Sequence, residues 1–375
     1  MTIGDPAVVE PACRVVLMLG TSMQTRGGVA AVVTTLRESG LFERARVRYV
    51  ATHVDGGRWR KLAQFAHACV VAVRALRSGT VSLVHAHVAS NASFWRKAFL
   101  LWVARRFRVA TVFHLHGGGF EAFAAHGFGG PVLRGCIRRT LESSDVVIVL
   151  SERWAAWVRA FAPRSRIRVI GNPVRCVCTA NLSTRRVRPT GNGGRVLFLG
   201  MICQAKGTFD LLRAWARARP RIGGWRLVIC GNGEAEPLFT EAARLGIRDD
   251  IEYLGWVTGD DKERELAAAD IFVLPSYVEG MPMALLEAMA HGVAVITTPV
   301  GGVPDMMEPG RHGLWVEPGN VQALAGCLER LANCPELRAK LGEAARHHVL
   351  EHYSVEAVEP QLSKVHHEAV ESARR

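Results

Sequence analysis

The chain has 375 residues, which is more than one ordinary hydrophobic core needs. Its residues are 49% hydrophobic and 22% charged, a composition that excludes a disordered protein. No apolar run approaches the ~20 residues that cross a bilayer, and residues 1–11 lack the features of a signal peptide. Cys176 and Cys178 are the only close pair among nine cysteines, and their spacing fits neither a zinc site nor a redox motif. We therefore expect a reduced, cytoplasmic, two-domain protein.

The net charge of +13 is concentrated in the first half of the chain. Residues 1–180 carry 25 Lys and Arg against 9 Asp and Glu, whereas residues 181–375 carry 22 against 25. This asymmetry points to an anionic membrane, a phosphate-bearing acceptor or a nucleic acid as the partner of the first half. The alternative is that arginine replaces lysine on a solvated surface without any such partner.

Short apolar runs alternate with helical patterns through the first half. The first run, residues 15–19, is followed by Gly20, and Gly27 and Gly28 open a helix expected over residues 29–38. Uninterrupted β-branched runs of this length are typical of parallel strands covered on both faces, and the helices between them make βαβ units. The further strands expected here are residues 46–50, 83–87, 110–115 and 146–150.

A polar, glycine-rich segment interrupts this alternation, and we interpret residues 179–194 as a linker. Residues 355–375 are expected to form a helix that packs back toward the first domain. The architecture is therefore α/β, with two doubly wound parallel-sheet domains at residues 1–178 and 195–354. The strands expected in the second domain are residues 196–199, 227–230, 251–253, 271–274, 294–297 and 313–316.

Residues 274–288, LPSYVEGMPMALLEA, form the most informative stretch. A strand is expected to end at its first residue, and Pro282 suits the first turn of the following helix. The free amides of that turn can hold a diphosphate, while Glu279 and Glu287 can bind the hydroxyls of a sugar and a ribose. Taken alone, either glutamate is more simply explained as an acid favoured at a helix start or as a solvated side chain on a helix. Together they suit a ligand in which sugar, diphosphate and nucleoside lie in line.

This stretch resembles the signature of the retaining family 4 glycosyltransferases, which have two Rossmann-like domains facing across a cleft, the GT-B fold. Gly27 and Gly28 resemble the family's glycine loop, and Gly200 with Lys206 resembles its donor phosphate site. Residues 171–174 are similar to the interdomain turn of the family. Other motifs are similar to members that build bacterial exopolysaccharides, namely His85, His87, residues 93–97, His114 and His116.

The resemblance implies roles for individual residues. His116 and Glu279 are the candidate catalytic residues, because His116 would lie beside the donor sugar and Glu279 would bind its hydroxyls. Lys206 would neutralise the diphosphate, and Glu287 would bind the ribose. The full set of candidate donor-binding residues is Gly27, Gly28, Lys206, Gly280, Met281, Pro282 and Glu287. Met201 departs from the pattern, since the family places an arginine there to share the diphosphate with the lysine.

The implied activity is retaining transfer of a hexose from GDP-mannose or a UDP-sugar to a saccharide linked to polyprenyl diphosphate. The enzyme would work at the cytoplasmic face of the membrane, in exopolysaccharide or cell-envelope glycan synthesis. Two other functions were weighed. Nucleotide-sugar epimerases share the fold, but they lack an arrangement of two glutamates and a lysine like that of Glu279, Glu287 and Lys206. A basic nucleic-acid binder explains the charge but neither the glycine turns nor the paired carboxylates, so no nucleic-acid partner is expected.

No catalytic metal and no cofactor are expected. The chain contains no Asp-x-Asp motif, each histidine pair lacks a matching third ligand, and the acids at 249–250 and 260–261 are placed in polar loops. Lys206 and the helix-start amides would therefore neutralise charge in place of a metal.

Residues 94–108 are basic, apolar and aromatic. As a helix they can lie on an anionic membrane surface. They can equally be the crossover helix between two parallel strands, with its apolar side buried, and both interpretations can hold at once.

Overall fold

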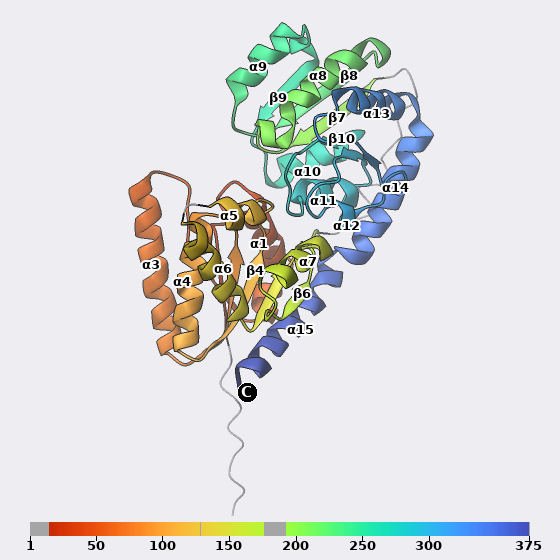
Figure 1. Ribbon diagram of the computed structural model, residues 1–375. Coiled ribbons are helices and arrows are strands. Elements are labelled where there is room, and N and C mark those ends of the chain that lie inside the picture. Colours follow the sequence, from red (N-terminus) through yellow and green to blue (C-terminus); the bar gives the residue numbers. More distant parts are fainter. Residues whose placement is uncertain (1–14, 128, 176–192, 375) are drawn as a thin grey trace, which may run out of the picture.

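The computed structural model describes residues 15–127, 129–175 and 193–374. The expected linker, the pair Cys176 and Cys178 and the first residues of the chain lie almost wholly outside these ranges. The described residues form two α/β domains, seen in Figure 1 as a lower and an upper body joined along the long C-terminal helix. The helices in these ranges include none that is long and apolar enough to cross a membrane.

The first domain is built on a six-stranded parallel sheet of order β2-β1-β3-β4-β5-β6. Its strands are β1 (Val15–Gly20), β2 (Val47–Ala51), β3 (Val81–Val88), β4 (Ala110–Leu115), β5 (Val146–Val149) and β6 (Ile167–Val169). Its helices are α1 (Gly28–Glu38), α2 (Leu41–Arg44), α3 (Arg58–Arg77), α4 (Ala92–Arg106), α5 (Phe120–His126), α6 (Gly130–Glu142) and α7 (Glu152–Phe161). The order shows that the chain crosses over the sheet between β2 and β3, which places the reversal of strand order beside β1.

The second domain also has a six-stranded parallel sheet, but its order, β12-β11-β10-β7-β8-β9, places the crossover between β9 and β10 and the reversal beside β7. Its strands are β7 (Gly194–Leu199), β8 (Trp225–Cys230), β9 (Ile251–Gly255), β10 (Ile271–Leu274), β11 (Ala294–Thr297) and β12 (Leu314–Trp315). Its α-helices are α8 (Thr208–Ala218), α9 (Ala235–Arg244), α10 (Gly259–Ala268), α11 (Met283–Ala290), α12 (Val303–Met306), α13 (Val321–Asn333) and α14 (Pro335–His352). Three short 3-10 helices accompany them, namely η2 (Gln204–Lys206), η3 (Arg219–Arg221) and η4 (Arg248–Asp250).

The sheet of the first domain is buried on both faces, as the continuous apolar runs predict. One face packs against α3 to α7 through residues such as Leu17, Phe113 and Val147. The other packs through Met18 and Val112 into a core that continues across the second domain. The final helix, α15 (Val355–Arg374), crosses back from the second domain and lies against β3, β4 and β5.

The helix α15 is attached to the first domain by apolar and charged contacts. Its residues Val358, Leu362 and Val365 are buried, and each such side chain contributes roughly 1.5–3 kcal/mol when removed from water. At its surface Arg168 pairs with Glu368 at 3.0 Å. The expected α/β architecture of two doubly wound sheets with a returning C-terminal helix is therefore confirmed.

Three local expectations are wrong. The short strand β6 was missed, because it is only three residues long and Arg168 interrupts its apolar run. Pro282 is the extended residue before α11 rather than part of its first turn. The acids at 260–261 lie in the first turn of α10, and those at 249–250 in η4, instead of in loops.

Candidate active site

The segment between β10 and α11 carries the central charged pair of the site. Glu279 is only 6% exposed, and its Oε1 accepts hydrogen bonds from Lys206 Nζ and Ser276 Oγ, both at 2.7 Å. A buried carboxylate needs such partners because its desolvation is otherwise costly. The helix start predicted to hold a diphosphate thus has a lysine and a carboxylate joined directly beside it.

Lys206 is carried to this position by a glycine that no other residue can replace without strain. Gly207 has φ 68°, and a Cβ added there would lie 2.0 Å from the carbonyl oxygen of Pro275. The turn at the end of η2 therefore packs directly against the segment that follows β10. The Lys206 side chain keeps 29% exposure, so its charge faces both Glu279 and solvent.

Glu287 is also paired, with a lysine that was not anticipated from the sequence. Lys262 Nζ lies 2.7 Å from Glu287 Oε1, and both side chains are mostly buried. Lys262 belongs to α10, whose neighbouring residue Glu263 contacts His291 at 3.0 Å. No local motif marks Lys262, because its partner is 25 residues away on another helix.

The first domain meets the segment around Glu279 through the turn after β4. A Cβ on Gly118 would lie 2.4 Å from the carbonyl carbon of Glu279, and one on Gly280 would lie 2.6 Å from the carbonyl oxygen of His116. Asn172, in the turn that resembles the interdomain motif, donates its Nδ2 hydrogen to the Met281 carbonyl oxygen at 2.9 Å. The candidate catalytic residues His116 and Glu279 therefore lie in backbone segments that touch across the domain boundary.

The remaining predicted residues differ in how much open space lies beside them for a ligand. Gly27 and Gly28 open α1, which contacts α11, and a Cβ on either would meet nothing within 4 Å. Met281 is buried and its sulfur contacts the Asn172 amide, so only its backbone could face a ligand. Met201, where the family pattern has arginine, is 52% exposed after β7.

Beneath His116 lies a group of buried histidines that connects β3, β4 and α15. Residues two apart on a strand point to one face, so His85 and His87 align with His114 and His116. The hydrogen-bonded pairs are His85 with His114 at 3.1 Å, His87 with His116 at 2.7 Å and His85 with His366 at 2.9 Å. This group was not predicted as a unit, because His366 is 281 residues from His85.

Burial keeps these histidines neutral. Desolvation lowers the pKa of His85, His87 and His114 well below the ordinary value, and lowers that of His366 to about 4. His116 as a residue is half-buried at the domain boundary. Burial and the charge of Lys97 lower its pKa to about 3. At neutral pH His116 is therefore an uncharged group.

The histidine pairs do not lack a third metal ligand, contrary to the expectation from the sequence, because the two pairs lie side by side. Each of His85, His87 and His114 can bring a ring nitrogen within 4.8 Å of the others. Nε2 of His87 and of His114 are buried and have no hydrogen-bond partner in the part of the chain that the structure describes. Imidazole nitrogens are good ligands for zinc and similar ions. The absence of a catalytic metal stays a prediction.

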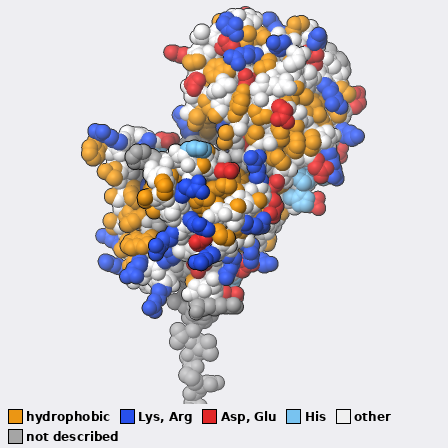
Figure 2. Space-filling view, in the orientation of Figure 1, with side chains coloured by type: hydrophobic (Ala, Val, Ile, Leu, Met, Phe, Trp, Pro, Cys, Tyr) orange, Lys and Arg blue, Asp and Glu red, His pale blue; other side chains and the backbone are white. Residues whose placement is uncertain are grey.

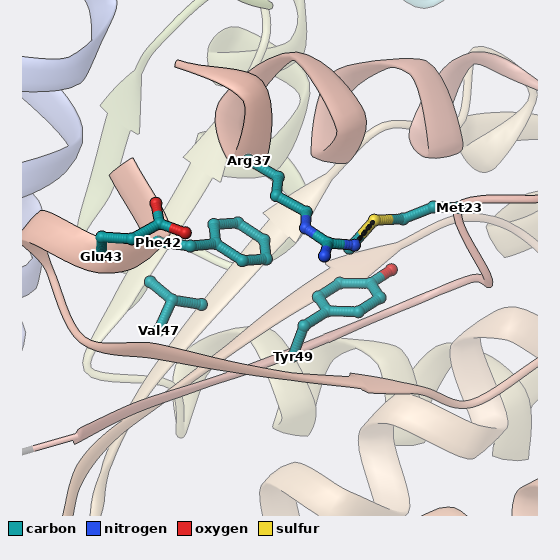
Figure 3. A pocket seen from close by; sticks show the side chains of 6 residues that line it. All are labelled: Met23, Arg37, Phe42, Glu43, Val47 and Tyr49. Atoms are coloured by element: carbon teal, nitrogen blue, oxygen red, sulfur yellow. Dashed lines mark hydrogen bonds between the residues drawn. The ribbon is translucent and has the colours of Figure 1, made fainter. Parts of the chain in front are cut away.

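A hollow of about 480 Å³ opens at another edge of the first domain, between α1, α2 and β2. Figure 3 shows Arg37 extending from α1 toward Met23, with the Phe42 and Tyr49 side chains beside it. The Arg37 guanidinium donates to the sulfur of Met23 at 3.6 Å. None of the predicted site residues lines this hollow, so it is not part of the candidate site.

Two family profiles match the chain, and each covers one domain. The family described as "Glycosyltransferase Family 4" matches residues 12–176. The family described as "Glycosyl transferases group 1" matches residues 184–348.

Curated relatives are similar over part or most of the chain. A D-inositol 3-phosphate glycosyltransferase of Streptomyces bingchenggensis is 27% identical over 86% of this chain and 76% of its own length. A GDP-mannose-dependent alpha-(1-6)-phosphatidylinositol monomannoside mannosyltransferase of Mycobacterium tuberculosis is 30% identical over 58% of this chain and 60% of its own. Other relatives are matched over only about half of their length.

Solved structures share the whole fold. A sucrose-phosphate synthase from Thermosynechococcus elongatus superimposes with a TM-score of 0.78 at 20% identity, covering 95% of this chain and 98% of that one. The Anabaena protein HepE in complex with UDP-glucose gives a TM-score of 0.70 at 19% identity, over 94% and 98% of the two chains. At these identities the likeness shows the common two-domain fold.

Proposed function

Because this chain belongs to the family 4 glycosyltransferases of the GT-B fold, we propose that it transfers a hexose, with retention, from a nucleotide diphosphate sugar to a lipid-linked saccharide. The observation that carries the proposal is the Lys206–Glu279 pair at the start of α11, in contact with the His116 turn. A cation for phosphate and a carboxylate for sugar hydroxyls stand next to each other there. Family membership leaves the epimerase and nucleic-acid interpretations without support.

The donor is a UDP-sugar or GDP-mannose. HepE was captured with UDP-glucose, and the mycobacterial relative is described as GDP-mannose-dependent. In this chain Glu287, held by Lys262, binds the ribose. Gly27, Gly28 and the N–H groups of Gly280 and Met281 approach the phosphates, with the Pro282 backbone beside them. The open space beside Gly27 and Gly28 supports this placement.

The transfer proceeds with same-face attack at the anomeric carbon. The acceptor hydroxyl oxygen bonds to that carbon, the bond to the β-phosphate oxygen breaks, and the departing phosphate takes the hydroxyl proton. Lys206 shifts from Glu279 toward the phosphate as negative charge develops, which frees Glu279 for the sugar hydroxyls. Neutral His116 forms a hydrogen bond with the sugar, as donor or as acceptor, and adds no charge to the site. Lys206 and the helix-start amides do this without a metal ion.

The acceptor is a saccharide on polyprenyl diphosphate, reached at the cytoplasmic face of the membrane. In support, the outer surface of α3 and α4 combines exposed aromatic and basic side chains. Trp59 is 71% and Trp102 54% exposed, and Phe99 stacks against Trp102 with ring centroids 6.1 Å apart. Figure 2 shows hydrophobic, lysine and arginine side chains intermingled on the left of the lower domain, over these helices. Phe94 and Leu101 of α4 are buried, so the crossover-helix interpretation of residues 94–108 is confirmed, while their contact with a membrane is part of this proposal.

The test is a transfer assay with the purified full chain, membranes from a polysaccharide-producing bacterium, and labelled UDP-glucose or GDP-mannose. We expect label to enter the lipid fraction from one donor, in equal amounts with EDTA and with magnesium. Hydrolysis of the donor without transfer to any lipid or saccharide would contradict the proposal. Loss of transfer in EDTA that manganese restores would contradict its metal-independent part.

A further inference from the structure

A lysine charge is buried in the first domain without a carboxylate partner. Lys97 of α4 is 2% exposed, and its Nζ donates to Ser93 Oγ at 2.9 Å. Across the described ranges no Asp or Glu lies within ion-pair distance of it, although isolated buried charges are costly. Burial, with the nearby charge of Arg96, lowers the Lys97 pKa to about 7. Burial thus disfavours the charged form of Lys97, and a bound anion would favour it.

Three further polar atoms around this lysine have no partner. Arg96 Nε, Ser90 Oγ and His53 Nδ1 are buried and form no hydrogen bond with any residue that the structure describes. The charges of Arg96, Lys61 and Lys97 add to burial in lowering the His53 pKa, so these groups act on one another electrostatically. Asp55 is the one acid that acts on His53 in the opposite direction, and it also accepts the Arg26 amide hydrogen. Unsatisfied donors beside unpaired cations indicate a place for an anion.

This cluster adjoins the candidate active site. Ser93 Oγ accepts from the Ala89 amide at the end of β3 as well as from Lys97. A Cβ on Gly117 would lie 3.3 Å from Ser90 Oγ, so the turn carrying His116 packs on the same residues. The charge of Lys97, together with burial, also lowers the pKa of His116. An anion bound by Arg96 and Lys97 would therefore lie on the first-domain side of the reacting sugar.

The outer side of the cluster leads to the aromatic surface of α3 and α4. Trp95 follows Phe94 on α4 and is exposed, while Phe99 contacts Phe65 of α3 with ring centroids 6.3 Å apart. A ligand with a phosphate group at Arg96 could thus extend an apolar tail along exposed aromatic side chains. This order of chemistry, sugar then phosphate then hydrocarbon, matches a lipid-linked saccharide.

We infer that Arg96, Lys97, Ser90 and His53 bind the diphosphate of the acceptor's lipid carrier. The inference rests on the proposed function and assigns a second phosphate site, separate from the donor site at Lys206. Two cations and several free donors suit a diphosphate, whereas neutral sugar hydroxyls would leave the charges uncompensated. The site holds the carrier so that the saccharide reaches the sugar bound at Glu279.

The experiment measures binding of farnesyl diphosphate to the full chain by calorimetry, with saturating UDP or GDP present to occupy the donor site. We expect micromolar-range binding that inorganic pyrophosphate competes away and that farnesol does not reproduce. Arg96→Gln should weaken it by roughly 10- to 100-fold, the effect of removing a charge-assisted hydrogen bond. Arg106→Gln, which removes the same charge from an exposed position on the same helix, should leave it unchanged.

Several results would overturn the inference. Equal affinity of the Arg96→Gln and Arg106→Gln variants for farnesyl diphosphate would do so. Competition by phosphatidylglycerol vesicles but not by pyrophosphate would also do so, because it indicates that the site binds a phospholipid headgroup. Wild-type protein that binds UDP or GDP but no farnesyl diphosphate would also overturn it while leaving the proposed function intact. Failure to bind any nucleotide would count against the proposed function, and the Arg96 comparison would still decide the site. Unchanged UDP affinity and melting temperature show that the Arg96 variant is folded.

Discussion

The two domains treat their positive charges in opposite ways. In the second domain each lysine of the candidate site is paired, Lys206 with Glu279 and Lys262 with Glu287, both at 2.7 Å. In the first domain Arg96 and Lys97 line the same region without a carboxylate partner among the described residues, and the buried groups below them are neutral histidines. The difference follows the +16 and −3 charges of the two halves of the sequence.

This contrast indicates which ligand charge would suit the candidate site in each domain. A lysine already paired with a carboxylate presents little net charge, and the pair can divide between a phosphate and a hydroxyl when a sugar nucleotide binds. Unpaired buried cations instead favour a ligand that supplies the anion itself. The four predictions that follow test each half of the comparison, beginning with the largest expected effect.

Glu279→Gln should lower the rate of transfer on the order of 100- to 1000-fold, the loss typical of removing a charged or polar group aimed at the reacting centre. Nucleotide affinity should be retained, because the substitution also frees Lys206 to face the phosphates. Initial rates and nucleotide titrations on the same preparation measure both quantities. Glu343→Gln, an exposed position, serves as the control. Turnover at the wild-type rate would remove Glu279 from the mechanism.

Lys206→Ala should weaken nucleoside diphosphate binding by about 2–3 kcal/mol, and nucleoside monophosphate binding much less. The loss is large because Glu279 then stands unpaired beside the phosphates and Met201 supplies no second cation. Lys262→Ala should instead weaken both ligands alike, since its partner Glu287 is placed at the ribose. Calorimetric titrations of both variants and of Lys340→Ala make the comparison. Equal, small changes for both ligands in Lys206→Ala would place Lys206 outside the phosphate site.

The histidine group should make the first domain sensitive to acid. Its histidines have a lower pKa in the folded chain than the ordinary value near 6.5, so the unfolded chain binds more protons as the pH falls below that value. Stability is thus complete above pH 6.5 and is lost below it, by about 1.4 kcal/mol per histidine for each pH unit. Melting temperatures between pH 7.5 and 5.5 measure this loss.

A variant separates this group from the other histidines of the chain. His366→Gln removes the one member on α15 and should flatten the pH dependence of the melting temperature, while His367→Gln, on the same helix but exposed, should not. Identical pH profiles for both variants would show that the buried group does not control acid stability.

Membrane attachment is the smallest effect per residue, roughly 1 kcal/mol for each basic side chain near an anionic leaflet. The protein should sediment with vesicles containing phosphatidylglycerol and be released by high salt, because the attraction is screened. Trp59→Ser with Trp102→Ser, or Arg60→Gln with Arg74→Gln, should weaken sedimentation. Arg264→Gln with Arg311→Gln, equal in charge but in the second domain, should not. If wild-type protein ignores such vesicles at low salt, the surface of α3 and α4 has another purpose.

The sequence by itself determined most strands of the two sheets and the stretch proposed to bind the donor. The bounds of β4, β10 and β11 agree with the apolar runs, because a strand covered on both faces must be apolar throughout. The stretch containing Glu279 and Glu287 was found because strand, turn and helix start are consecutive there, so its geometry is local.

Only the tertiary structure decided which charges meet. Lys262 reaches Glu287 from another helix, Lys206 reaches Glu279 across 73 residues, and His366 reaches His85 across 281. It also showed that Lys97 is buried, although it belongs to the basic, aromatic run of residues 94–108 that could equally have faced a membrane. Periodicity reports which side of an element is apolar, but not which elements pack together. Burial and pairing of charges depend on that packing, and they distinguish the two halves of this site.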